Sequence, residues 1–502
     1  MRSISKRGAL AALVALAMTR APAAAQAPEA SAEDEGAEAE AAPDVPEPPN
    51  ELEARLAAIE ARERARDAEL ERALGRVDEL ERTLAASAEA EPAPAAPAAP
   101  SGPTVRPLAS FLTRFEHRDG YAALGAANPG CFPGANDGDC LRYRAEVGLA
   151  IEDLRVADEI VAAVRFRPQV AGFWSFGGTS GGVAHPALGL FEGALILQLG
   201  DMVRIDAGRI VLNYGDEMVL GSLRWHPAGR SFDGARMRIQ PETSGYWIDV
   251  FWTMLDEGGP GGFGWGDGYL YGAYAGLGPI LGPNAALDVY ALARQDNDRA
   301  DPRTGAMIDY SLRLHVGSRF RYRVDVIDLR AEAGFQTGRA GGPAGTDPAL
   351  ILAGHVDAEV GVNLLEDRLR FGAHGFYASG ENPSSANTTE AYDQLFPTAH
   401  AFLGWSDVMG PRRNVTGGAL HVMGKPVPQL RVSLDLFVFA RPEDGGRDAY
   451  VGSEGNLQAS WLPGAGLRVR GMYALFVPNA GAFAMGRDPV HYVEVEVGYE
   501  LN

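Results

Sequence analysis

Hydrophobic and polar side chains alternate along most of the chain after residue 103. In residues 141–152 (LRYRAEVGLAIE), the even positions are mostly charged and the odd positions are mostly apolar. The same alternation recurs in residues 163–170, in residues 311–325 and, near the C-terminus, in residues 492–501. Successive side chains of a β-strand point to opposite faces, so a period of two predicts strands with one charged and one apolar face.

The connections between these strands alternate between short and long. Residues 154–160 and 362–370 contain tight turns, whereas residues 296–309 and 380–414 are long connections. This layout is typical of outer-membrane β-barrels and distinguishes them from a soluble β-sandwich with one solvent-exposed face. Residues 103–502 are therefore predicted to form an all-β, antiparallel transmembrane barrel of about 18 strands, whose closure leaves no free sheet edge.

The first 25 residues have the features of a secretory signal peptide. The basic segment MRSISKR precedes an apolar stretch that is too short to span a bilayer, and small residues follow it. Residues 26–49 are rich in Ala, Glu and Pro and contain no aromatic side chain, a composition that predicts a disordered spacer. Export predicts a barrel in the bacterial outer membrane, with the N-terminal segment in the periplasm.

Residues 50–87 are predicted to form an α-helical coiled coil. Leu52 and Leu56 open a heptad pattern of apolar positions that is still in register at Leu80. Charged residues occupy two core positions in the middle of the pattern, which leaves a lone solvated helix as the alternative. Residues 88–102 are rich in Pro and Ala and are predicted to be a stiff linker.

Arginine is concentrated on the polar faces of the predicted strands. The chain has a net charge of −21, but the acidic excess per residue is greatest in its first hundred residues. In RWHPAGRSFDGARMRI, Arg236 and Arg238 occupy alternate positions of a predicted strand, and this parity places both side chains on its lumen face. Arg224 and Arg230 lie in the preceding loop, where they can form a constriction. Arginine binds carboxylates with a planar fork, so these residues predict a path for anions. The alternative is that they pair with neighbouring acids and stiffen the wall.

The predicted substrate path draws on several strands and on one loop. Its densest group is Arg319, Arg321 and Arg323, which share one strand. Asp233 is positioned either to orient Arg230 or to meet the substrate. The lumen and constriction candidates are Arg142, Arg144, Arg165, Arg167, Arg224, Arg230, Asp233, Arg236, Arg238, Arg313, Arg319, Arg321, Arg323 and Arg370.

Cys131 and Cys140 are the only cysteines, and they bracket a turn-rich loop. Export places them in an oxidising compartment, and two thiols alone make a poor set of metal ligands. A disulfide between them is therefore predicted in preference to a metal site.

The chain lacks the sequence signatures of common enzymes and of bound cofactors. It contains no serine-centred nucleophile elbow, no HExxH and no glycine-rich phosphate cradle that opens a helix. Its histidines are not spaced as metal ligands on one strand and are predicted to be polar wall residues: His226, His315, His355 and His374. We therefore predict no enzyme activity, no metal, no cofactor and no nucleic-acid partner.

Two segments resemble the alginate export family of outer-membrane porins. Residues 206–239 contain a GRI strand, a YGD element, a tryptophan and then GRSFD, in the order of that family's pattern. Residues 377–414 are similar to the family's late segment around FPTAH. The resemblance implies a monomeric barrel of this size whose arginine-lined lumen passes a polyuronate chain.

Three functions fit these observations. The first is a passive outer-membrane channel for anionic solutes, with export of an acidic polysaccharide resembling alginate as the favoured case. The second is a trimeric porin that takes up small anions or sugar acids and is held together by the coiled coil. The third is a structural tether, in which the coiled coil self-associates or binds a periplasmic partner and the barrel is an anchor in outer-membrane lipid.

Overall fold

The computed structural model describes most of the chain from residue 102 to residue 501. The described ranges are 102–121, 137–176, 183–241, 245–256, 267–300, 307–343, 346–385, 387–398, 402–483 and 488–501. The predicted signal peptide, spacer and coiled coil lie outside these ranges, as does the linker up to residue 101. Cys140 is fully buried and is not a free thiol. Cys131 lies outside the described residues, so the disulfide stays a prediction.

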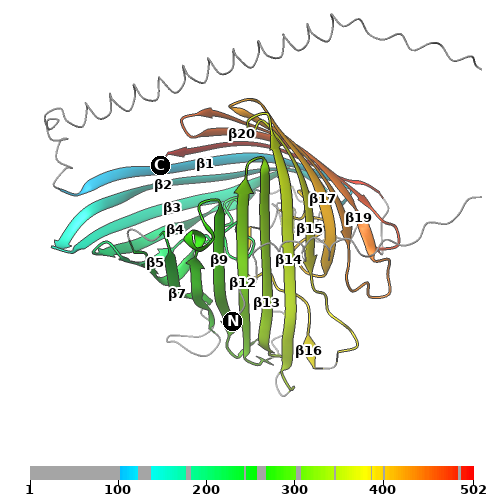
Figure 1. The fold of residues 1–502 in the computed structure, drawn as a ribbon, viewed down its shortest axis with the longest axis horizontal. Helices are drawn as coiled ribbons and strands as arrows, with labels where there is room; N and C mark the ends of the chain where they lie inside the picture. The colour runs from blue at the N-terminus through cyan, green and yellow to red at the C-terminus, as the bar shows by residue number, and fades with distance from the viewer. Residues whose placement is uncertain are drawn as a thin grey trace, which may run out of the picture. The chain divides into compact units, whose positions relative to one another are not determined.

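The described residues form a closed antiparallel barrel of 18 strands, as the alternation predicts (Figure 1). Its strands are β1 (Thr104–Asp119), β2 (Gly138–Ala157), β3 (Ile160–Phe176), β4 (Val183–Leu199), β5 (Val203–Ile210), β6 (Phe232–Ile239), β7 (Trp247–Asp256), β8 (Gly268–Gly276), β9 (Ala285–Asp296), β12 (Ser311–Val324), β13 (Ile327–Ala340), β14 (Ala349–Leu364), β15 (Leu369–Ala378), β17 (Val415–Val427), β18 (Leu430–Ala440), β19 (Tyr450–Gly464), β20 (Leu467–Pro478) and β21 (Val490–Leu501).

Each strand pairs with its neighbours along the chain, and the first and last strands close the ring. β1 pairs with β2 on one side and with β21 on the other, where Arg114 lies opposite Glu496. Blue β1 and the red C-terminal strand accordingly lie side by side in Figure 1. The remaining elements are short: η1 (Gly278–Leu281), the pair β10 (Arg299–Ala300) and β11 (Met307–Ile308), and β16 (Thr388–Thr389). No helix among the described residues has the length and apolar composition needed to cross a membrane.

The two faces of the strands have opposite character. In β1, Phe111 and Phe115 are exposed on the outer face, whereas Arg114 and Glu116 point inward and are fully buried. Apolar side chains outside and charged side chains inside are the reverse of a soluble sandwich and are expected for a barrel in lipid. The predicted lumen-facing parity of Arg236 and Arg238 on β6 is found, because both pair with inward acids.

Long and short connections lie at opposite ends of the barrel. Residues 325–326 and 465–466 are two-residue turns at one end, which we call the short-turn end, whereas residues 211–231 and 379–414 belong to the long-loop end. In the turn 465–466 both residues have positive φ, as a two-residue hairpin turn with the native twist requires. A Cβ on Gly466 would lie 2.0 Å from the Glu500 carbonyl oxygen, so glycine is required there.

Candidate functional site

Two long loops fold into the barrel instead of standing above it. They are the β5–β6 loop (residues 211–231) and the β15–β17 loop (residues 379–414). Leu212 and Leu220 of the first loop and Tyr392 of the second are fully buried. Loops with so many apolar side chains gain by packing against the barrel interior, where they remove that surface from water. These two loops also contain most of the residues on which the family resemblance rests.

The two loops are joined to each other by backbone hydrogen bonds around one parallel bridge between Leu220 and Phe396. The Phe396 amide donates to the Val219 carbonyl at 3.0 Å, and the Gly221 amide donates to the Phe396 carbonyl at 2.9 Å. A separate backbone bond joins the same loops, in which the Thr398 amide donates to the Glu217 carbonyl at 2.8 Å. Backbone bonds of this kind satisfy polar groups that the loops would otherwise bury without a partner. The loops therefore form one constriction and not two independent flaps.

Arg230 connects the same two loops through its side chain. Its Nη1 donates to the carbonyl oxygens of Pro397 at 3.0 Å and Gly221 at 3.3 Å, and its guanidinium lies 5.5 Å from the centre of the Phe396 ring. Burial lowers the pKa of Arg230 from its usual value, and burial also lowers the pKa of His226 in the same loop. Arg230 thus lies at the predicted constriction, where it braces the loops.

The β5–β6 loop also reaches opposite parts of the barrel wall. Its Asp216 accepts a hydrogen bond from Arg319 of β12 at 2.6 Å. At its other end, Arg224 donates to Glu146 of β2 at 2.6 Å. β2 and β12 are separated by the strands β3 to β9 around the ring. The loop consequently crosses the lumen, held at each end by a charge-assisted hydrogen bond.

The β15–β17 loop is attached to the wall mainly by buried charges. Arg412 and Asp357 of β14 form an ion pair at 2.8 Å in which both side chains are 0 % exposed. Glu454 of β19 accepts hydrogen bonds from the backbone amides of Trp405 at 2.6 Å and Ser406 at 3.1 Å. A buried charge is tolerated only when it is paired, so these contacts determine where the loop lies.

Most of the predicted path arginines have carboxylate partners in the wall or in a loop. The ion pairs join Arg142 to Glu116; Arg144, Arg167 and Arg224 to Glu146; Arg165 to Glu192; Arg236 to Asp206 and Asp249; Arg238 to Asp249; Arg313 to Asp393; Arg319 to Asp216 and Asp288; Arg323 to Asp367; and Arg370 to Asp328 and Glu359. For these residues the stiffening alternative describes the observed geometry. Their positive charge is largely neutralised locally.

Asp233 occupies a different position from the one expected. It is the second residue of β6 and forms a 3.0 Å ion pair with Arg209 of β5, and its side chain is 59 % exposed. Its parity is opposite to that of Arg236, which faces the lumen. Of the two roles predicted for Asp233, orienting Arg230 does not fit this pairing, and meeting a substrate in the lumen does not fit the outward parity.

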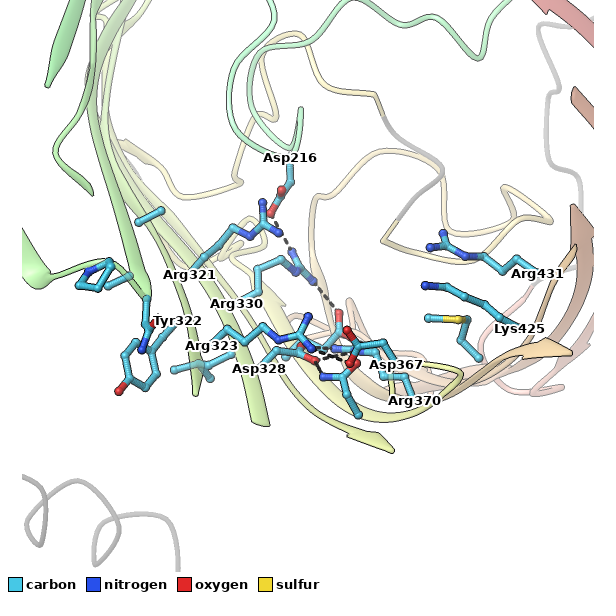
Figure 2. A pocket seen from close by; sticks show the side chains of 18 residues that line it. Asp216, Arg321, Tyr322, Arg323, Asp328, Arg330, Asp367, Arg370, Lys425 and Arg431 are labelled. Atoms are coloured by element: carbon cyan, nitrogen blue, oxygen red, sulfur yellow. Dashed lines mark hydrogen bonds and ion pairs between the residues drawn. The ribbon is translucent and has the colours of Figure 1, made fainter. Parts of the chain in front are cut away.

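Three cations around one cavity have no ion-pair partner in the part of the chain that the structure describes. They are Arg321 of β12, Lys425 of β17 and Arg431 of β18, and they line a cavity of about 600 Å³ near the short-turn end. Figure 2 shows Lys425 and Arg431 pointing into the cavity from one side and Arg321 from the other.

The carboxylates at this cavity are already engaged. Asp328 and Glu359 pair with Arg370, and Asp367 pairs with Arg323. The unpaired cations therefore leave the cavity with an excess of positive charge. We call this cavity and its lining the basic vestibule.

A second cavity of about 250 Å³ continues from the basic vestibule toward the β15–β17 loop. Both cavities are lined by Glu359, Arg370, Met423 and Arg431, and the second one also includes Trp405 of the loop. A solute in the vestibule is thus one step from the constriction. The geometry suits binding and passage of an anion.

The prediction from sequence missed Lys425 and left Arg431 out of the candidate path. Lys425 is the only lysine of the barrel, and it stands three residues before the two-residue turn between β17 and β18. Arg431 has the parity of the inward Asp435, and Lys425 has the parity of the inward His421, although the register shifts between Gly424 and Val427. That signal was present in the sequence, but it does not reveal which cations lack a partner.

Comparison with known proteins supports a channel. A family model described as alginate export matches residues 194–460, a segment that includes both inner loops. None of the curated proteins matches the chain.

Solved structures share the fold at low sequence identity. OccAB4 of Acinetobacter baumannii is 11 % identical, with a TM-score of 0.53 over 80 % of this chain and 100 % of that one. OccK5 (OpdH) of Pseudomonas aeruginosa is 13 % identical, with a TM-score of 0.52 over 79 % and 98 %. OpdK of Pseudomonas aeruginosa, solved with vanillate, is 11 % identical, with a TM-score of 0.51 over 79 % and 98 %.

Proposed function

The chain belongs to the alginate export family, and we propose that this outer-membrane barrel is a passive channel through which an acidic polysaccharide leaves the cell. Carboxylates repeated along a polymer require several weak cationic sites, each strong enough to attract one unit and weak enough to release it. The polymer would move down its own concentration gradient, because nothing in the proposal supplies energy. The family and the related barrels point to a channel rather than an enzyme.

The basic vestibule is the observation that carries this proposal. Arg321, Lys425 and Arg431 have no ion-pair partner among the described residues, so their charges are available to a solute. The many paired arginines of the wall would have to break an existing ion pair before binding an anion. Arginine offers a bidentate fork and lysine a mobile point charge, a combination that holds a uronate carboxylate without rigid positioning.

The orientation of the barrel in the membrane favours entry at the vestibule. Outer-membrane barrels have their short turns on the periplasmic side and their long loops outside. The vestibule lies near the short-turn end, where a polymer made inside the cell would arrive. As the signal peptide predicts, we propose that the N-terminal segment lies in the periplasm.

Replacing the three unpaired cations is expected to weaken anion binding while leaving the barrel folded. The variant is Arg321→Gln, Lys425→Gln, Arg431→Gln. A charge-assisted hydrogen bond contributes about 1.5 kcal/mol or more, so the removal of each cation should raise the oligouronate concentration that half-blocks the current roughly tenfold. The reversal potential in a salt gradient should also shift toward cation selectivity. Planar-bilayer recording of both quantities provides the test.

Arg106→Gln is the matched control for this variant. Arg106 lies in β1 near the same end of the barrel and is also partly exposed, but it pairs with Glu152 and does not line the vestibule. The control should leave block by oligouronates nearly unchanged. If the triple variant keeps both wild-type block and wild-type selectivity, the vestibule does not bind the solute and the proposal fails.

Uptake of small anions is the second candidate function. It is favoured by the likeness to OpdK, whose structure was solved with vanillate, a small aromatic carboxylate. Crosslinking in native membranes separates the candidates, since a monomer fits export and a trimer fits uptake. Uptake would also be favoured if vanillate half-blocks the current at the same concentration as a long oligouronate does. The tether function rests on residues outside the described ranges and stays a hypothesis.

A further inference from the structure

Two histidines on different strands meet inside the barrel wall. His315 lies on β12 and His355 on β14, on either side of β13. Their side chains are almost completely buried, with residue exposures of 0 % and 2 %. The ring centres are 5.7 Å apart and the ring planes are inclined by 74°. Among the described residues, none of the four ring nitrogens has a hydrogen-bond partner, which is unusual for buried polar atoms.

Gly334 of β13 reveals where the two rings point. A Cβ added to Gly334 would lie 2.3 Å from His315 Nε2 and 2.7 Å from His355 Nε2. Both nitrogens are therefore directed at one small space above the glycine. Bonds from imidazole nitrogen to zinc are about 2.0–2.1 Å long, so an ion in this space could bind both rings after small shifts. Any residue larger than glycine would fill the space.

A third side chain covers the histidine pair from the β15–β17 loop. The Tyr392 ring lies 4.6 Å from the His355 ring and 5.6 Å from the His315 ring, measured between centres. Its hydroxyl is buried and has no hydrogen-bond partner in the part of the chain that the structure describes. Within the described ranges, no group of three His, Cys, Asp or Glu side chains could hold a metal. An ion here would accordingly have two imidazole ligands and depend on oxygen, from Tyr392 or water, for the rest.

The surroundings do not oppose a cation strongly. The arginines whose charges act on the pair, Arg313 on His315 and Arg412 on His355, are themselves paired with Asp393 and Asp357. Glu332, two residues from Gly334 on the same face of β13, accepts a hydrogen bond from the Tyr290 hydroxyl and adds a carboxyl group beside the pair. The positive charges around the site are thus balanced by acids.

We propose that His315 and His355 bind a first-row transition metal ion of the kind that favours imidazole nitrogen, such as Zn²⁺ or Cu²⁺, above Gly334. Such an ion would join β12 to β14 and lie beneath Tyr392, so it would hold the β15–β17 loop against the wall. An ion that binds only the folded state stabilises it by mass action. The site is separate from the basic vestibule, since neither histidine lines that cavity.

The test is metal binding by the purified, folded, full-length barrel without a histidine tag. The protein is stripped with EDTA, and Zn²⁺ and then Cu²⁺ are added while heat release and bound metal per chain are measured. We expect one ion per chain and, for Cu²⁺, an electron paramagnetic resonance spectrum with coupling to two nitrogens. His315→Gln and His355→Gln should each weaken binding by more than about tenfold, the loss that even outer-shell changes cause.

Two further variants make the result specific. His421→Gln removes a partly buried lumen histidine outside the pair, one that contacts Asp435, and should bind as the wild type does. Gly334→Ala keeps both ligands but fills the space between them, and should abolish binding. If the wild type binds no ion at micromolar concentration, or if the double variant His315→Gln, His355→Gln binds equally well, the proposal is overturned.

Discussion

Deletion of residues 215–229 is expected to raise the single-channel conductance roughly several-fold, because barrels of this strand number leave an aqueous lumen when no loop fills it. In the intact protein the β5–β6 loop crosses that lumen from Asp216 at β12 to Arg224 at β2. The strand ladder around the barrel is untouched by the deletion. A change in electrophoretic migration on heating first shows that the variant is folded. Planar-bilayer recording then measures its conductance.

A disulfide that locks the two loops together serves as the control. Leu220 and Phe396 form a parallel bridge between the loops, so Leu220→Cys with Phe396→Cys places two thiols on neighbouring loop segments. Oxidation should leave the conductance as it is in the reduced protein, because the loops are already joined. A folded deletion variant with wild-type conductance would show that the β5–β6 loop does not restrict the lumen. A fall in conductance on oxidation would show that the loops separate when the channel conducts.

Asp357→Asn is expected to lower the free energy of unfolding by about 3–5 kcal/mol, the usual cost of removing one member of a buried ion pair. Asp357 and Arg412 are both 0 % exposed, and Asp357 also contacts His374 at 2.9 Å and Arg330 at 2.9 Å. Asparagine has nearly the same shape but leaves the buried Arg412 guanidinium without its counter-charge. Urea unfolding in detergent, followed by intrinsic fluorescence, measures the change.

Removing both charges separates the electrostatic effect from the effect of packing. The double variant Asp357→Leu, Arg412→Met should recover most of the lost stability, because hydrophobic replacement of a whole buried pair is often neutral. Asp435→Asn, at a partly exposed contact with His421, should cost less than about 1 kcal/mol. A single variant as stable as the wild type would mean that water, and not Asp357, compensates Arg412.

Much of the barrel could be read from local patterns. The alternation in β1 and β2 and the alternating lengths of the connections predict the strands, their inward faces and the two ends. The inward position of Arg236 and Arg238 follows from parity alone. The same parity would have placed Asp233 outside, but its nearness to Arg230 in the sequence suggested a contact that the chain does not make. Closeness in sequence does not imply contact, because successive side chains of a strand point to opposite faces.

The candidate site could be predicted only in part. Arg321 was selected as one of three similar arginines, yet the structure pairs Arg319 and Arg323 with acids and leaves Arg321 without an ion-pair partner among the described residues. The partners Asp216 and Asp367 come from other parts of the chain. Whether a charge is available to a solute therefore depends on distant residues, and periodicity cannot show it.

The sequence by itself determined that this chain forms a transmembrane barrel, because a period of two and the lengths of turns are local properties that each strand carries independently. Only the tertiary structure decided how the lumen is filled and which side chains meet there. His315 and His355 are 40 residues apart and look unrelated in sequence, but strand register directs both rings at Gly334. Contacts across strands and inner loops depend on register and on loop direction, which no local pattern contains.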